Sequence, residues 1–147
     1  MPGYYSEEDK KIMQVSQKAL NKSRLQELID FIKISGFRKI GIAHCMSMQK
    51  YAERLKEILA GQGIEVYAIN CKESGLQGSD ICAMMSGACC DPVAQADYLN
   101  ALHCELNINI GLCLGHGLLF QKYSKAPVTT FVVKDFATQH KSVESLA

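Results

Sequence analysis

The stretch KIGIAHCMSMQKYAERLKEILAGQGIEVYAINC, residues 39–71, contains the pattern that decides the fold. It begins with a short apolar run, Lys39–Cys45, of the kind that forms a buried strand. Apolar residues then recur at helical spacing up to about Ala60, with Ser47 as the expected N-cap and glycines at the end. A second short apolar run, Glu65–Cys71, follows. A strand, a helix and a strand in this order predict two parallel strands joined by a right-handed crossover.

The same alternation continues toward the C-terminus. Asp91-Pro92 has the cap and the first residue of a helix, which is predicted to run to about Leu106. A third strand is predicted at Asn107–Cys113, a short helix at Gly115–Tyr123 and a fourth strand at Val128–Lys134. We therefore expect an α/β fold, namely a three-layer, four-stranded, mainly parallel sheet of the Rossmann-like or flavodoxin-like kind, with strand order 2-1-3-4.

Two helices are predicted before the first strand. Residues 6–20 have an apolar stripe at helical spacing, and Ser6 begins a loose capping box. After a turn at Asn21-Lys22, a second helix is predicted over Ser23–Ser35, with Gly36 as its stop. The fold is thus expected to carry an N-terminal helical pair.

The composition is that of an ordinary globular chain. A length of 147 residues, with 48% hydrophobic and 21% charged residues, is enough for one domain with its own core. We expect a single domain over residues 1–147, in which the helices of residues 1–36 pack on one face of the sheet or extend the contact of a homodimer. Sixteen Lys and Arg balance fifteen Asp and Glu, so the charge does not indicate a nucleic-acid partner.

The sequence also predicts the compartment. The N-terminal residues MPGYYSEEDKK are polar and acidic, unlike a secretion signal, and no apolar run approaches the roughly 18 residues of a membrane span. We therefore expect a cytoplasmic protein without a membrane partner, in which the seven cysteines stay reduced. In that compartment several cysteines are more typical of metal or thiol chemistry than of disulfides.

Three cysteines each end a predicted strand: Cys45, Cys71 and Cys113. The carboxyl ends of parallel strands lie on one edge of the sheet, which is where open α/β sheets bind ligands. Neighbouring strands are about 4.8 Å apart, so we expect these three thiols to converge although they are distant in sequence. The alternative is that each of them is a small apolar core residue, because buried cysteine is common in strands.

Two further residues are candidate metal ligands at the same edge. Cys90 comes just before the helix that leads into the third strand, and the N-terminus of that helix is expected to favour a thiolate. Cys90 is therefore predicted to be the most thiolate-like cysteine of the metal-free protein, with the adjacent Cys89 as the alternative for this place. His116 follows Cys113 by three residues, a spacing that can put both side chains on one ion.

The other cysteines have weaker signals. Cys104 is expected on the core face of a helix. Cys82 lies in the long segment Lys72–Ala88, which is interpreted either as a lid over the ligand edge or as a short helix that fills out the sheet. His44 is expected to be a core histidine, because it points to the face of the strand opposite Cys45.

Several stretches are distinctive enough to suggest a family. These are CLGHGLLFQKYSKAPV at residues 113–128, VVKD at 132–135, CDPVAQADYLN at 90–100, and the strands that end in Cys45 and in Cys71-Lys72. They resemble the family known as domain of unknown function 1847, uncharacterised metal-binding proteins of anaerobic bacteria and archaea.

The resemblance covers most of the chain, from about residue 20 to residue 140. It implies a metal-binding protein with no assigned reaction. It also implies metal candidates at Cys45, Cys71, Cys90 and Cys113, with His116 close by.

The sequence leaves two functions open. The first is a metal- or iron–sulfur-cluster-binding protein for electron transfer, sensing or metal handling, with a redox partner protein where electrons are transferred. Four thiolates suit either zinc or an iron–sulfur cluster, and the sequence does not separate the two. The alternative is a thiol enzyme for disulfide or persulfide chemistry with Cys90 as the nucleophile. The chain has no dinucleotide fingerprint, phosphate-binding loop or recognisable Ser/His/Asp order, so whether it is an enzyme also stays open.

Overall fold

The computed structural model describes residues 1–20 and 23–147, so the predicted turn at Asn21-Lys22 lies outside the described residues. The chain divides into two compact units, Met1–Arg38 and Lys39–Ala147. All four strands and all seven cysteines belong to the second unit. In the described part of the chain, no helix combines the length and the apolar character needed to cross a membrane.

The first unit consists of the predicted helical pair, α1 (Glu7–Ala19) and α2 (Arg24–Ser35). The capping box at the start of α1 is confirmed, because the Ser6 amide donates to Asp9 Oδ2 at 2.9 Å and the Asp9 amide donates to Ser6 Oγ at 3.1 Å. Gly36 ends α2 in the left-handed conformation, with φ at 75°.

The second unit is built on a parallel sheet in the order β2-β1-β3-β4, which confirms the predicted order 2-1-3-4. Its strands are β1 (Lys39–His44), β2 (Glu65–Asn70), β3 (Leu106–Ile110) and β4 (Val128–Val132). Strand β1 is central and buried over nearly its whole length, since it has a neighbour on each side and is covered on both faces.

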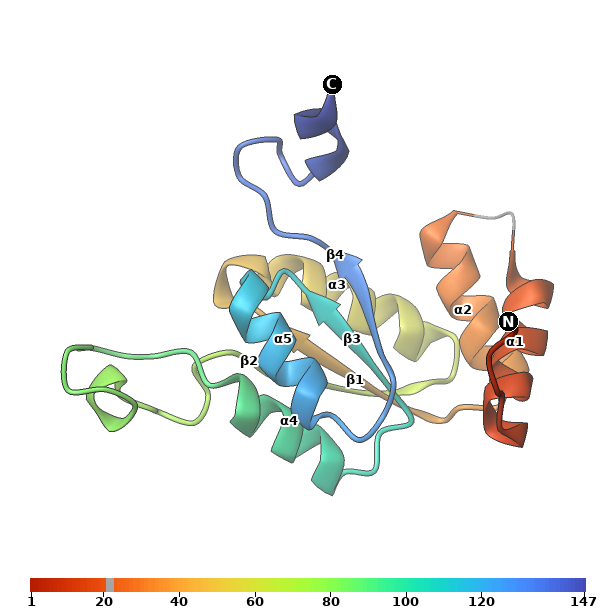
Figure 1. Ribbon diagram of the computed structural model, residues 1–147, viewed down its shortest axis with the longest axis horizontal. Coiled ribbons are helices and arrows are strands. Elements are labelled where there is room, and N and C mark those ends of the chain that lie inside the picture. The colour runs from red at the N-terminus through yellow and green to blue at the C-terminus, as the bar shows by residue number, and fades with distance from the viewer. Residues whose placement is uncertain (21–22) are drawn as a thin grey trace. The chain divides into compact units, whose positions relative to one another are not determined.

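Helices lie on both sides of this sheet (Figure 1). Helix α3 (Gln49–Gly61) lies on one face, and α4 (Pro92–Ala101) and α5 (Leu114–Tyr123) lie together on the other. The result is the predicted three-layer α/β arrangement. Short 3-10 helices are η1 (Met46–Met48), η2 (Gly78–Asp80) and η3 (Ser142–Leu146).

The register between β1 and β3 is fixed by a polar side chain that fills the space above a glycine. Gly41 pairs with Asn107, and a Cβ at Gly41 would overlap the Asn107 Oδ1 atom. Asn107 is fully buried, and its Nδ2 donates to Ser124 Oγ at 2.8 Å. The missing side chain of Gly41 therefore makes room for a buried amide in the centre of the sheet.

Helix α4 is shorter than predicted. It ends at Ala101 and does not continue to Leu106. His103 adopts a left-handed conformation, with φ at 57°, which turns the chain out of the helix and toward β3. Cys104 is buried, as predicted, but it precedes a strand and is not part of a helix.

Strands β3 and β4 also end earlier than predicted. Strand β3 ends at Ile110 because Gly111 has a φ of 68°, which breaks the extended conformation. Cys113 is consequently the N-cap residue of α5 and not the last residue of a strand. Strand β4 ends at Val132, so Lys134 lies in the loop that follows.

The segment Lys72–Ala88 is neither the predicted lid nor a helix that fills out the sheet. Gln77 and Ala88 form an isolated antiparallel bridge, and the Gly78 amide donates to the Gly87 carbonyl at 2.8 Å. The segment stands away from the sheet as a narrow loop (Figure 1, green). Its side chains are mostly exposed, and Cys82 is among them.

Candidate functional site

The candidate site lies at the carboxyl edge of the sheet. Cys45 follows β1 directly and Cys71 follows β2 directly, while Cys113 lies three residues beyond β3 and Lys134 two residues beyond β4. All four strands therefore bring a residue to this edge, as expected for the ligand-binding edge of a parallel sheet. All seven cysteines of the chain are free thiols.

Backbone hydrogen bonds hold three of these strand ends together. The Cys45 amide donates to the Ile110 carbonyl at 3.2 Å, which ties the end of β1 to the end of β3. The Gly111 amide donates to the Val132 carbonyl at 2.8 Å, which ties the end of β3 to the end of β4. These hydrogen bonds fix the backbone positions from which the side chains after the strands extend.

Lys134 connects two of the predicted cysteines. Its Nζ atom donates to Cys113 Sγ at 3.0 Å and to Cys45 Sγ at 3.3 Å. The two sulfur atoms are consequently no farther apart than the sum of these distances. Partial burial lowers the pKa of Lys134, but the contacts with the two thiols outweigh it and raise that pKa above its ordinary value. An ammonium group thus stands beside both sulfurs.

A hydroxyl group also contacts Cys45. The Cys45 Sγ atom lies 3.0 Å from Ser47 Oγ, and either atom can donate this hydrogen bond. Burial raises the pKa of Cys45, but hydrogen bonds from Ser47 and Lys134 lower it by more, so that the pKa falls below that of an ordinary thiol. The predicted role of Ser47 as a helix cap is wrong, because α3 begins after Met48 and has no side-chain cap.

Cys71 and Cys90 form a second pair of thiols. The Asp91 amide donates to the Cys71 carbonyl at 2.7 Å, which brings the residue before α4 next to the end of β2. Burial, followed by the hydrogen bond with the Cys71 thiol, raises the pKa of Cys90 to about 11. The prediction that Cys90 is the most thiolate-like cysteine is therefore wrong. The carboxylate of Asp91 accepts from the Ala94 amide at 2.9 Å, so the start of α4 already has an anionic cap.

The buried side chain of Gln95 forms hydrogen bonds near the ends of two strands, β1 and β2. Its Nε2 atom donates to the Ile69 carbonyl at 2.9 Å, two residues before Cys71, and to the His44 carbonyl at 3.2 Å, directly before Cys45. Gln95 is 1% exposed, and its Oε1 atom has no hydrogen-bond partner among the described residues. His44 is buried, as predicted, and its Nδ1 lies 3.0 Å from the Cys45 carbonyl oxygen.

The remaining residues considered in the sequence lie outside these two thiol pairs. His116 is half-buried in the first turn of α5. The thiol of Cys89 donates to the carbonyl of Cys90 at 3.3 Å. Cys104 lies near Lys39 and Glu65, which begin β1 and β2 at the opposite edge of the sheet.

The structure thus places Cys45, Cys71, Cys90 and Cys113 at one edge in two pairs. Within residues 1–20 and 23–147, however, no three His, Cys, Asp or Glu groups stand in an arrangement that could hold a metal ion.

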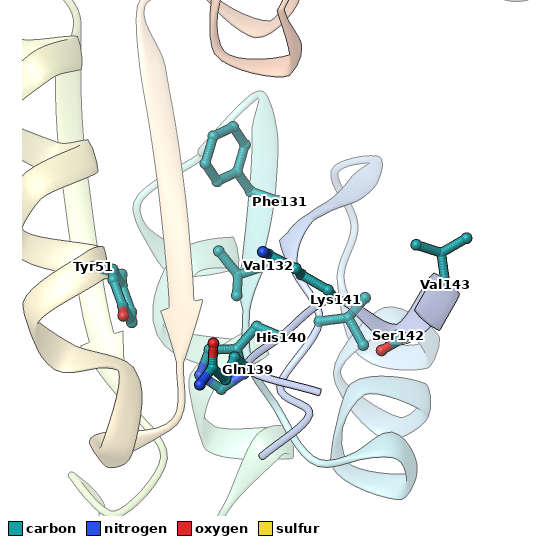
Figure 2. A pocket seen from close by; sticks show the side chains of 9 residues that line it. Tyr51, Phe131, Val132, Gln139, His140, Lys141, Ser142 and Val143 are labelled. Atoms are coloured by element: carbon teal, nitrogen blue, oxygen red, sulfur yellow. The ribbon is translucent and has the colours of Figure 1, made fainter. Parts of the chain in front are cut away.

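A cavity of about 510 Å³ lies next to this edge. Tyr51 of α3 faces the C-terminal segment across it, and its ring meets the His140 ring edge-on at 6.3 Å (Figure 2). Val132 and Val133, which precede Lys134, line the cavity, and none of its nine lining residues is a cysteine. The Asp135 amide donates to His140 Nδ1 at 2.9 Å, which fixes the chain immediately after Lys134.

Two comparisons place the chain among known proteins. Residues 2–131 match the family described as Protein of unknown function (DUF1847). The chain belongs to this family. The DUF1847 match confirms the resemblance seen in the sequence, and it includes every candidate cysteine but ends before Lys134. An uncharacterized protein of Methanocaldococcus jannaschii is 40% identical over 154 residues, which cover 97% of this chain and 79% of the relative. No solved structure matches this chain.

Proposed function

We propose that this DUF1847 protein binds a thiophilic metal centre, either an iron–sulfur cluster or a zinc ion, through Cys45, Cys71, Cys90 and Cys113. The observation that carries the proposal is the gathering of these four cysteines, in two pairs, at the carboxyl edge of one sheet. Thiolates are the ligands that zinc and iron–sulfur clusters share.

Lys134 supports the proposal from the electrostatic side. Its ammonium lies within 3.3 Å of two sulfurs, so this place in the protein already accommodates a cation. A lysine beside thiolate ligands also offsets the negative charge that several thiolates leave on a metal centre.

The arrangement of the thiols favours an iron–sulfur cluster over a single zinc ion. Since no three candidate ligands converge as they stand, a single ion would require side-chain rotations that bring the sulfurs closer together. An iron–sulfur cluster is larger than one ion and holds its cysteine ligands farther apart. Such a cluster would supply one-electron chemistry when bound.

The surroundings suit exchange with a partner protein. Cys113 is exposed at the start of α5, so one ligand is accessible from solvent, whereas Cys71 is 2% exposed and anchors the site in the core. Gln95 fixes the strand ends behind Cys45 and Cys71. A redox or metal-accepting partner would approach from the side of Cys113.

The test is the metal content of protein purified without oxygen, measured together with its absorption spectrum. We expect iron and sulfide with a brown colour for a cluster, or one zinc per chain in a colourless protein. Cys113→Ser is expected to lose most of the metal, because a serine hydroxyl stays protonated near neutral pH and is a poor ligand for a thiophilic ion.

Cys82→Ser and Cys104→Ser are the matched controls, with circular dichroism to confirm folding. Both change a cysteine that lies away from the edge, so both are expected to keep the metal. Folded Cys113→Ser with full metal content would refute the proposed site. Metal-free wild-type protein with one fast-reacting thiol would favour a thiol enzyme instead.

A further inference from the structure

The two thiol pairs differ in how accessible they are. Cys45 and Cys90 are both half-buried, but Cys113 is exposed, whereas Cys71 is only 2% exposed. Lys134 is in contact with both members of the accessible pair and with neither member of the other among the contacts described. A small solute from water therefore meets the Cys45–Cys113 pair first, next to a positive charge.

We propose that Cys45 and Cys113 form a reversible disulfide with each other when the protein meets an anionic low-molecular-weight disulfide. The ends of β1 and β3 are already joined by the hydrogen bond from the Cys45 amide to the Ile110 carbonyl, three residues before Cys113. For the two sulfurs to meet, the Lys134 ammonium that contacts both of them has to move away and the two side chains have to rotate toward each other.

Lys134 suits both stages of this exchange. Its charge attracts an anionic disulfide to the exposed side of the site. Once the two sulfurs have joined, they carry no negative charge, and the long lysine side chain returns to solvent. Cys71 and Cys90 remain as thiols, because Cys71 is enclosed by the core that Ile69 and Leu99 help to form.

The chemistry consists of two thiol–disulfide exchanges. The Cys113 thiolate attacks one sulfur of the added disulfide, whose S–S bond breaks and releases one thiolate. Cys45 then attacks the Cys113 sulfur, which breaks the mixed disulfide and releases the second thiolate. The two protons lost by the cysteines pass to the released thiolates, so two protein thiols are oxidised and one small disulfide is reduced.

A consequence for metal binding rests on the proposed function. A disulfide between Cys45 and Cys113 would remove two of the four sulfur ligands, so oxidation would release the metal centre. The site would then respond to the thiol–disulfide balance around the protein.

The experiment uses the full chain and glutathione disulfide as the probe. After incubation, free thiols are alkylated under denaturing conditions and the digested peptides are identified by mass. We expect the loss of two free thiols per chain, a linked pair of peptides that contain Cys45 and Cys113, and full recovery with dithiothreitol. Cys82→Ser should behave like the wild type, and Cys113→Ser should keep Cys45 as a free thiol.

The peptide map of the wild type alone decides the proposal, whether or not the variants fold. A principal link between Cys71 and Cys90, or oxidation that stops at a mixed disulfide on Cys113, would overturn it. Metal that stays bound while the Cys45–Cys113 link forms would overturn the consequence for metal release. Protein that never holds metal would instead refute the proposed function and leave the disulfide to be judged by the peptide map.

Discussion

At Cys45, two side chains act on one thiol from different parts of the chain. Ser47 belongs to η1, which directly follows Cys45, and Lys134 comes from the loop after β4. Groups that donate hydrogen bonds to a thiolate stabilise it, so they lower the pKa and bring the reactive form to lower pH.

The lowered pKa of Cys45 and the raised pKa of Cys90 predict the order in which cysteines of the metal-free protein react. Cys45 should be alkylated at lower pH than Cys90, whose pKa of about 11 requires strongly alkaline solution. The measurement is the rate of reaction with iodoacetamide at a series of pH values, followed by peptide mass. In Lys134→Gln the profile of Cys45 should move to higher pH, while that of Cys104 should stay. A Cys90 that reacts at lower pH than Cys45 would contradict the electrostatic account.

Gln95 offers a second test at the residue scale. Gln95→Leu introduces an apolar side chain of similar size and removes the two hydrogen bonds to the His44 and Ile69 carbonyls. We expect the free energy of unfolding to fall by about 2 kcal/mol, as for buried carbonyls that lose their donor. Urea denaturation measures the change, and Gln121→Leu at an exposed position of α5 is the control, expected within about 0.5 kcal/mol of the wild type. Equal stability of the two variants would show that Gln95 does not hold the strand ends.

At the scale of elements, the sequence predicts which segments are helices or strands better than where they end. The apolar runs predict β1 and β2 to within a residue. For β1 the physical reason is its central position, because a central strand of a parallel sheet is covered on both faces and must be apolar on both. The ends of α4 and β3 depend on single residues in left-handed conformations, His103 and Gly111. Periodicity carries no information about such conformations, so sequence patterns place the ends of both elements too far along the chain.

Gly111 allows the turn between β3 and α5, because its φ of 68° is strained for any residue with a Cβ. A Cβ at this position would be strained by the φ of 68° and would also overlap the Met48 side chain. We expect Gly111→Ala to lower the free energy of unfolding by about 3 kcal/mol. Gly63 has a φ of 81° but open space around it, so Gly63→Ala should cost only about 1 kcal/mol. Urea unfolding of both variants tests this, and equal losses would mean that the contact with Met48 is relieved without cost.

At the scale of the whole molecule, the hydrophobic core and the candidate site are parts of one cluster. Phe120 of α5 is fully buried in this cluster, and Cys45 and Cys90 pack against its rim. The site is therefore only as rigid as the core that supports it.

A cavity in this core should be costly. Phe120→Ala is expected to lower the free energy of unfolding by about 3–5 kcal/mol, through lost burial and the cavity that remains. Leu118→Ala on the same helix is the control, because Leu118 is 63% exposed and should change the stability by less than about 0.5 kcal/mol. Thermal or urea unfolding gives both values, and a loss near zero for Phe120→Ala would contradict the description of the core.

The candidate site was predictable as far as topology determines it. Strand order alone brings Cys45, Cys71 and Cys113 to one edge, and this needs no knowledge of side-chain conformation. Lys134 was not recognised, although it ends the predicted fourth strand, because its contact with Cys45 spans 89 positions and depends on the turn after Val132. The raised pKa of Cys90 depends on its burial beside Cys71, which sequence spacing does not reveal.

The pairing of Gly41 with Asn107 has a consequence for how this family evolves. Any side chain at position 41 needs the space that the Asn107 amide fills, and a smaller residue at position 107 alone would leave a hole and remove the hydrogen bond that Asn107 donates to Ser124. A protein that carries only one of the two substitutions is therefore expected to be less stable than one that carries neither or both. Across homologous sequences the two positions are therefore expected to vary together, so that ancestors crossed from one pair of residues to another only when both had changed.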